Sequence, residues 1–389
     1  MSVVHVVPYF PPDRIGGVGE HVKVIHEGHL EMGVDSLIVT SGATTSDPRV
    51  QRVGKTPTGF AFNSWRRWRH ATSCDVLHVH HGEGVLLALV ARLRRTRPAI
   101  LAMFHIDVRM RERASGPVVF EGRRFGPAGT RNLMRSLGGA VKALVDRILW
   151  MLADAVVVET NAVASEVSDL RPKRPVTVIP HGLGPSPNLE GRPEEVELLY
   201  VGTPGIRKRT HLLPSILVRV RDSVPAARLR IVGFGPDDDP NLRTEAERLG
   251  VVEAIEFVGP VLAEEVVPHY RAAQVLVLPS AYEGLPMVLL EAMREGLVPV
   301  ATNVSGHPDA IEDGVSGYLF PVDSVGTAGD RCVQSLSAAA KAKKRMSLQA
   351  QKAIEERFSL LAELSAYRQL YEAAKEGRDG RSDQTLSDS

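Results

Sequence analysis

Two glutamates with seven residues between them, Glu283 and Glu291, occupy a stretch where an apolar strand is expected to meet a helix. Carboxylates accept hydrogen bonds from paired hydroxyls, such as the 2′ and 3′ groups of a ribose or vicinal hydroxyls of a hexose. Acids at a helix start can also do no more than complement the helix dipole. The pair could therefore hold two ends of one hydroxylated ligand, or it could be structural.

The turn between the two glutamates suits an anion. The branched apolar run at 273–279 is typical of a parallel strand covered on both faces. Pro286 favours a first helical turn, because it lacks an NH that would need a partner. Gly284 lets the backbone approach a ligand closely. Amides near Leu285 and Met287 would carry the positive end of the helix dipole, which predicts a phosphate site.

The stretch from Ser280 to Glu291, with the Glu-Ala-Met-x-x-Gly-x-x-Pro-Val pattern at 291–300, closely resembles the donor-binding signature of family 4 glycosyltransferases. These are retaining enzymes of the GT-B fold, in which two doubly wound Rossmann-like α/β domains face each other across a cleft. The resemblance implies that Glu283 meets the transferred sugar and Glu291 the nucleoside ribose. The backbone that it places against the sugar and diphosphate comprises Gly284, Leu285, Pro286 and Met287.

Three further positions match the family at the ends of expected strands. The resemblance places Gly17 near the donor phosphate and the reacting sugar, and His105 against the donor sugar or phosphate. Lys208 matches a lysine that neutralises the leaving diphosphate. From the residues alone, the turn at Gly17 could be a simple tight turn, and a single histidine is usually structural. His105, Lys208 and Glu283 are the predicted catalytic residues.

The sequence departs from the family at Thr203, which stands where an arginine is normally found. Arg207 or Arg209, on the same loop, could supply the missing charge to the donor. If neither does, stabilisation of the leaving group weakens and turnover slows. A solvated basic turn is the alternative explanation of this loop.

Two clusters invite a metal. In the run at 76–81, alternation would put His78 and His80 on one face of a strand, but no carboxylate or cysteine completes a ligand set. We expect His80 or His81 to line the acceptor site instead. The three aspartates at 237–239 precede a helix, where acids complement the dipole. We therefore expect no metal, and no cofactor besides a nucleotide-sugar co-substrate, taken to be a UDP-sugar.

Composition describes an ordinary globular protein of 389 residues, with 43% hydrophobic and 24% charged residues and only two cysteines. No secretion signal or long uncharged apolar segment is evident, so we expect a cytoplasmic protein without a membrane span. Residues 1–184 carry 24 Lys and Arg against 16 Asp and Glu. This basic half could face an anionic acceptor or membrane headgroups, or merely present solvated Arg-rich helices. No nucleic-acid partner is expected.

Apolar runs alternate with helix-length segments, which indicates an α/β protein with parallel sheets. The expected strands are 3–7, 35–39, 76–79, 99–104, 155–159, 176–179, 196–201, 228–232, 255–258, 275–278 and 298–301. The Gly- and Pro-rich segment at 180–191 separates an N-terminal acceptor-binding domain over 1–184 from a C-terminal nucleotide-sugar-binding domain over 185–357. The family implies that a helix at about 358–376 crosses back to the first domain. The polar tail at 377–389 is predicted to be disordered.

The resemblance implies a retaining transfer of a hexose or amino-hexose to a hydroxyl acceptor. The implied mechanism is front-face, with the leaving phosphate as the base. Acceptor contacts would come from His80, His81 and Arg109. The acceptor could be a small metabolite or natural product, or a glycolipid or polysaccharide precursor at a membrane surface. Alternatives are a catalytically weak sugar-nucleotide-binding partner, for which Thr203 is the hint, and a phosphorylase or epimerase of the same fold.

Overall fold

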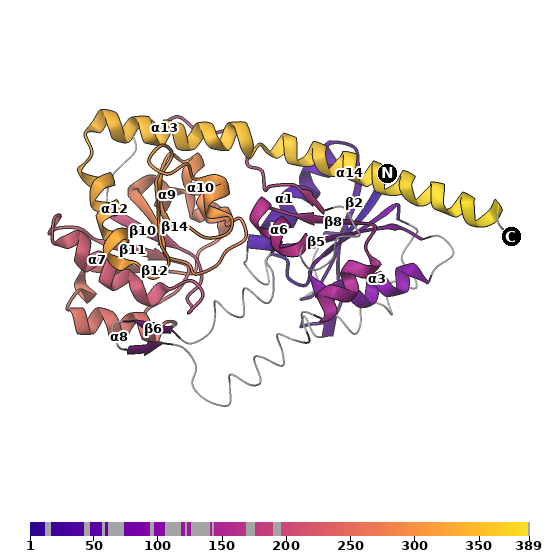
Figure 1. Ribbon diagram of the computed structural model, residues 1–389. Coiled ribbons are helices and arrows are strands. Elements are labelled where there is room, and N and C mark those ends of the chain that lie inside the picture. Colours follow the sequence, from indigo (N-terminus) through magenta and orange to yellow (C-terminus); the bar gives the residue numbers. More distant parts are fainter. Residues whose placement is uncertain are drawn as a thin grey trace. The chain divides into compact units, whose positions relative to one another are not determined.

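A computed structural model provides the structure of the chain, which forms two compact units. It describes residues 1–11, 17–42, 47–56, 59–60, 74–93, 97–105, 118–120, 123–125, 141, 144–168, 176–189 and 196–387. Unit 1 comprises Met1–Val108, Leu137–His181 and Leu361–Ser389, and unit 2 comprises Arg109–Ser136 and Gly182–Leu360. The division after His181 falls within the Gly- and Pro-rich segment. Each unit is an α/β structure (Figure 1).

In the described part of unit 1, seven strands form one parallel sheet in the order β3-β2-β1-β4-β5-β8-β9. The strands are β1 (Ser2–Val6), β2 (Asp35–Thr40), β3 (Val50–Arg52), β4 (Val76–His80), β5 (Ala99–Phe104), β8 (Ala155–Val158) and β9 (Val176–Val178). The strand order reverses between β1 and β4. Ligands of open parallel sheets bind outside the carboxyl ends of the strands at such a reversal.

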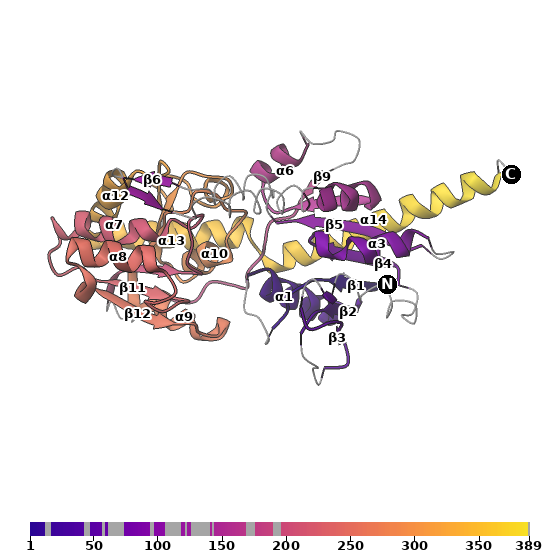
Figure 2. The ribbon, with the colours of Figure 1, turned by 90° about the horizontal axis from the view of Figure 1, so that it is seen from below.

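Helices cover both faces of this sheet. They are α1 (Gly17–Glu31), η1 (Gly82–Gly84), α3 (Val85–Arg92), α6 (Asn161–Ser168) and α14 (Leu360–Ser387). In Figures 1 and 2, α3 and α14 lie on opposite sides of the sheet. Alternation along β4 sorts its side chains accordingly, because Leu77 and Val79 join the cluster that contains Leu87 of α3. His78 and His80 therefore point to the face that α14 covers.

Helix α14 continues to Ser387, whereas the sequence favours a disordered tail from Gly377. No proline interrupts the segment, so nothing in the chain forces the helix to stop earlier. Tyr367 and Tyr371 are its fully buried residues and anchor it in unit 1. Among the described residues, no helix is both long enough and apolar enough to cross a membrane.

Unit 2 contains a second parallel sheet in the order β12-β11-β10-β13-β14-β15. Its strands are β10 (Val196–Val201), β11 (Leu229–Val232), β12 (Ile255–Gly259), β13 (Ala273–Leu278), β14 (Val298–Thr302) and β15 (Tyr318–Phe320). The strand order reverses between β10 and β13. A short antiparallel pair, β6 (Val118–Phe120) and β7 (Arg123–Phe125), is grouped with this unit.

The helices of unit 2 enclose a core built on this sheet, in which β10 and β13 are the central strands. They are η2 (Thr210–Leu212), α7 (Leu213–Arg221), α8 (Pro240–Leu249), η3 (Val252–Ala254), η4 (Ala263–Glu265), α9 (Val267–Ala272), α10 (Met287–Arg294), α11 (His307–Ala310), α12 (Val325–Ser337) and α13 (Ala340–Arg357). The predicted α/β class with parallel sheets is confirmed. Each sheet leaves one strand-order reversal at which loops from two central strands meet.

Candidate active site

The loops that follow β10 and β13 meet at the strand-order reversal of unit 2. Lys208 Nζ lies 2.6 Å from Glu283 Oε1, and Arg207 Nη1 lies 3.0 Å from Glu283 Oε2. Arg207 also donates a hydrogen bond to the Tyr282 carbonyl over 2.8 Å, and its own carbonyl accepts one from the Ala281 amide over 2.8 Å. Side chains and backbone thus tie the two loops together.

Glu283 is a buried carboxylate held in its charged form by two cations. Burial opposes its ionisation, but Lys208 and Arg207 outweigh that penalty and lower the pKa of Glu283 to about 2. Burial also lowers the pKa of the Lys208 ammonium group, and the nearby Glu283 offsets part of that effect. Two positive charges and one negative charge leave a net positive charge of one. The cluster is therefore suited to receive an anion.

Arg207, rather than Arg209, shares Glu283 with Lys208. The Arg209 guanidinium donates to Asp323 Oδ1 over 2.7 Å and to the Ile206 carbonyl over 2.7 Å, and its side chain is buried. Thr203, where the family has arginine, is exposed, and its carbonyl accepts a hydrogen bond from the Tyr200 hydroxyl over 3.0 Å. Of the two arginines, Arg207 is thus the one that contacts Glu283.

A close backbone approach shapes this loop. Gly202 and Gly233 have φ angles of 146° and 116°, which other residues rarely adopt. A Cβ atom at Gly233 would lie 2.4 Å from the Gly202 carbonyl oxygen. The ends of β10 and β11 can therefore meet only because both positions are glycine.

The three aspartates after β11 have structural partners. Asp239 is buried and caps α8, where its side chain accepts a hydrogen bond from the Leu242 amide. Asp238 accepts from the Gly235 amide over 2.8 Å, and Asp237 pairs with Arg243. Asp239 differs from the expected solvated acid, because capping and a bond from Thr210 hold it inside.

Helix α10 begins at Met287, with Pro286 as the residue that precedes it in extended conformation, so the predicted start near Pro286 is confirmed. The first amides of a helix have no hydrogen-bond partner within the helix. In α10 these amides come shortly after Glu283 and the buried Gly284 in the sequence. Leu285 is buried in the core of unit 2. This arrangement orients amides and the positive helix end toward the loop that carries the charged cluster.

Glu291 is oriented by a tyrosine that the sequence did not single out. The Tyr270 hydroxyl, on α9, donates a hydrogen bond to Glu291 Oε2 over 2.8 Å. Tyr270 is fully buried, and burial together with Glu291 raises the pKa of its phenol well above the usual value, so it remains a donor. Glu291 itself is only partly buried. Its carboxylate is thus positioned yet reachable by a ligand.

His105 follows β5 directly, as the sequence predicts. It lies beside Glu159, which no sequence motif singles out. His105 Nδ1 makes a very short contact with Glu159 Oε1, and His181 Nε2 lies 3.1 Å from the same oxygen. His181 Nδ1 lies 3.8 Å from Glu363 Oε1, which in turn is 2.6 Å from His21 Nε2. We call these five buried residues the His–Glu chain.

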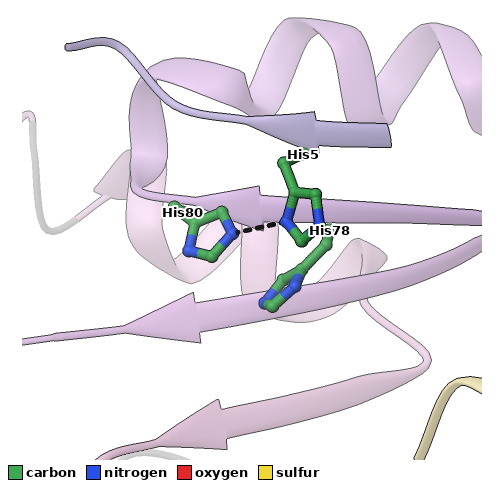
Figure 3. A group of neighbouring side chains, drawn as sticks. All are labelled: His5, His78 and His80. Carbon is green, nitrogen blue, oxygen red and sulfur yellow. Dashed lines mark hydrogen bonds between the residues drawn. The ribbon is translucent and has the colours of Figure 1, made fainter. Parts of the chain in front are cut away.

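The other histidines of the strand at 76–80 lie in the interior. Figure 3 shows His5, His78 and His80 together, with His5 Nδ1 and His80 Nε2 joined by a 3.1 Å hydrogen bond. All three are fully buried, and the Tyr371 hydroxyl lies 2.9 Å from His78 Nδ1. Their ring nitrogens are close enough to hold a metal, but without a carboxylate the charge of a buried dication would be uncompensated.

The remaining predicted positions of unit 1 fall at strand and helix ends. His80 is buried with its ring 5.9 Å from that of His105, because alternation turns it to the covered face of the sheet. His81 follows at the end of β4 and is partly exposed. Gly17 is exposed at the start of α1, and a Cβ atom there would meet no described atom within 4 Å. Arg109 lies outside the described residues.

The chain thus has two α/β units, each with a parallel sheet, and a cluster of net positive charge at the strand-order reversal of unit 2. Residues 15–186 match the family model of "Glycosyltransferase Family 4", and residues 195–338 match that of "Glycosyl transferases group 1". These two matches together span most of the chain. The chain therefore belongs to the group 1, family 4 glycosyltransferases, it is a glycosyltransferase, and its fold is GT-B.

Similar proteins agree with this assignment. The chain is 26% identical to glycogen synthase of Mycobacterium tuberculosis over 97% of its own length and 96% of that protein. Sucrose-phosphate synthase of Thermosynechococcus elongatus has a similar structure, with a TM-score of 0.78, 18% identity, and coverage of 96% and 99% of the two chains. Anabaena HepE, solved with UDP and glucose, has a TM-score of 0.70, 14% identity, and coverage of 96% and 100%.

Proposed function

We propose that the protein transfers a hexose or amino-hexose from a UDP-sugar to a hydroxyl acceptor, with retention of the anomeric configuration and without a metal. The observation that carries this proposal is the convergence of Arg207 and Lys208 on Glu283 at the strand-order reversal of unit 2. The net positive charge of this cluster and the start of α10 suit a diphosphate. HepE, a structural relative, was solved with UDP, which supports a UDP-sugar as donor.

The donor-binding roles follow from chemistry and position. Glu291, held by Tyr270, accepts hydrogen bonds from the two ribose hydroxyls. Glu283 accepts from hydroxyls of the transferred sugar, and it releases Lys208 and Arg207 to the diphosphate when the donor binds. Gly17 keeps the role that the family resemblance implies, next to the donor phosphate and the transferred sugar.

The reaction breaks the bond between the anomeric carbon and the phosphate oxygen while positive charge grows on that carbon. Lys208 and Arg207 stabilise the negative charge on the departing diphosphate, which is the role that a metal ion has in other glycosyltransferases. The departing phosphate oxygen takes the proton from the acceptor hydroxyl, which attacks from the same face. His105 contacts the transferred sugar in unit 1.

The acceptor is a hydroxyl compound bound through His81 of unit 1 and through Arg109. The basic composition of residues 1–184 favours an anionic acceptor, either a small phosphorylated metabolite or a glycolipid headgroup at a membrane surface. A catalytically weak sugar-nucleotide-binding partner is the second candidate, because Thr203 replaces a family arginine.

Calorimetry with UDP, ADP, GDP and dTDP tests the donor site. We expect the tightest binding for UDP and a marked loss of affinity in Glu291→Ala. Glu253→Ala removes an exposed glutamate of η3 in the same unit and is the matched control, which should bind as the wild type does. Undiminished binding by Glu291→Ala would contradict the ribose role. An assay for donor hydrolysis then separates turnover from binding alone, and an inverted product by NMR would refute the front-face mechanism.

A further inference from the structure

The His–Glu chain of unit 1 joins residues that are distant in sequence. His105 follows β5, Glu159 follows β8, and His181 ends unit 1 before the chain enters unit 2. All five members are buried, and the two carboxylates alternate with the imidazoles. Buried charges persist only when they are paired and hydrogen-bonded, so this arrangement constrains the protons of each ring.

Glu159 fixes the proton on His105. Burial disfavours its ionisation, but the charge of His181 and the hydrogen bonds from His105 and His181 outweigh that effect and hold the pKa of Glu159 well below its usual range. An ionised carboxylate is an acceptor only, so both His105 Nδ1 and His181 Nε2 must donate to it. His105 Nδ1 therefore carries hydrogen.

Among the described residues, His105 Nε2 is buried and has no hydrogen-bond partner. In the neutral ring, a proton on Nδ1 makes Nε2 a lone-pair acceptor. The negative charge of Glu159 at the opposite nitrogen increases its strength as an acceptor, as outer carboxylates do for functional histidines.

We propose that Glu159 is a positioning residue that fixes the His105 tautomer, so that Nε2 accepts a hydrogen bond from a hydroxyl of the transferred sugar. A neutral Nε2 cannot donate to a phosphate oxygen, and an ionised phosphate has no proton to give. The tautomer thereby assigns His105 to the sugar rather than to the diphosphate. This inference rests on the proposed function for its substrate, although the tautomer itself does not.

Glu363 provides a matched comparison within the same chain. It contacts His21 and the far nitrogen of His181, whereas Glu159 contacts His105 directly. Burial opposes its ionisation, while His21 and His181 lower the pKa of Glu363 to about 2, so it is a carboxylate of similar burial and charge. Substituting either glutamate disturbs the network, but Glu159→Gln alters the carboxylate that contacts His105 directly.

The direct test is 15N NMR of the free wild-type protein with labelled histidine, with His105→Asn used to assign the signals. We expect the proton of His105 to lie on Nδ1 and not on Nε2, and Glu159→Gln to allow both tautomers. A proton on Nε2 in the wild type would overturn the inference. So would a stoichiometric transition metal found by mass spectrometry, since His105, Glu159 and His181 could also ligate one.

Kinetics with monodeoxy UDP-sugars test the consequence. We expect Glu159→Gln to lower kcat by about 10- to 100-fold, the range seen for carboxylates that orient metal-bound histidines, with KM little changed. One deoxy sugar should be insensitive to the substitution, because it lacks the hydroxyl that Nε2 accepts. An equal loss in Glu363→Gln would refute the positioning role. If the tautomer is as expected but no donor is turned over, the proposed function fails while the tautomer assignment stands.

Discussion

Replacing Lys208 with methionine tests the charged cluster of unit 2. Methionine keeps the length and the apolar contacts of the side chain but removes the ammonium group 2.6 Å from Glu283. The net charge of the cluster then falls from one to zero, because Arg207 and Glu283 remain as a neutral pair. We expect donor binding to survive in part and the transfer step to slow strongly.

The magnitude follows from Coulomb's law. A unit charge about 4 Å from a phosphate charge is worth about 4 kcal/mol at an effective dielectric constant of about 20. Each ~1.4 kcal/mol corresponds to a tenfold change in rate, so about 10³-fold is the upper limit. Arg207 and the amides of α10 remain, and we expect kcat/KM to fall by about 10²- to 10³-fold.

The assay measures release of the nucleoside diphosphate in steady state, with circular dichroism to confirm folding. Arg209→Met is the control, because it removes a neighbouring cation that pairs with Asp323 instead of Glu283. Its kcat/KM should stay close to that of the wild type. A Lys208→Met protein that retains wild-type kcat/KM, or an Arg209→Met protein with the greater loss, would show that the cluster does not serve the leaving group.

Three further outcomes are expected. Tyr270→Phe should lower the free energy of unfolding by about 0.5–1.5 kcal/mol and weaken UDP binding measured by calorimetry, because Glu291 loses its donor; unchanged UDP affinity would argue against a positioned carboxylate. Gly233→Ala should destabilise the protein by at least about 1–3 kcal/mol in urea titrations, since its φ is 116°, and a wild-type midpoint would contradict this. Because folding lowers the pKa of Glu283 and Glu363 from 4.5 to about 2, their stabilisation is complete above pH 4.5 and is lost as pH falls toward 2. The corresponding fall in urea stability should be smaller in Glu363→Gln, and an equal fall would count against the ionised carboxylate.

The sequence predicts the long central strands well, because a predominantly apolar run of six residues, as in β5 or β13, is typical of a buried parallel strand. The short strands β3 and β15 were not predicted, and three residues are too few to establish a period, although β9 of the same length was predicted from its apolar run. The antiparallel pair β6 and β7 was missed for the same reason.

The sequence predicts those site residues that lie in turns with a recognisable local motif. Glu283 and Lys208 belong to turns that the sequence marks with glycine and proline, and the structure brings them together. Glu159 and Tyr270 carry no local signal, because their partners come from other elements and become neighbours only through the sheet topology. Alternation predicts that His78 and His80 share a face, but β4 is buried on both faces, so the sequence does not show that α14 covers the histidine side.

The central claim is that the protein transfers a sugar from a nucleotide donor, and mass spectrometry of products tests it most directly. The wild-type protein would be incubated with UDP-, ADP-, GDP- and dTDP-sugars, each with a panel of lipid and small-molecule hydroxyl acceptors. We predict an acceptor mass increased by one hexose or amino-hexose residue, together with an equal amount of UDP released, and loss of both in Lys208→Met. UDP binding without any glycosylated product or hydrolysis across the panel would contradict the account and favour a sugar-nucleotide-binding partner.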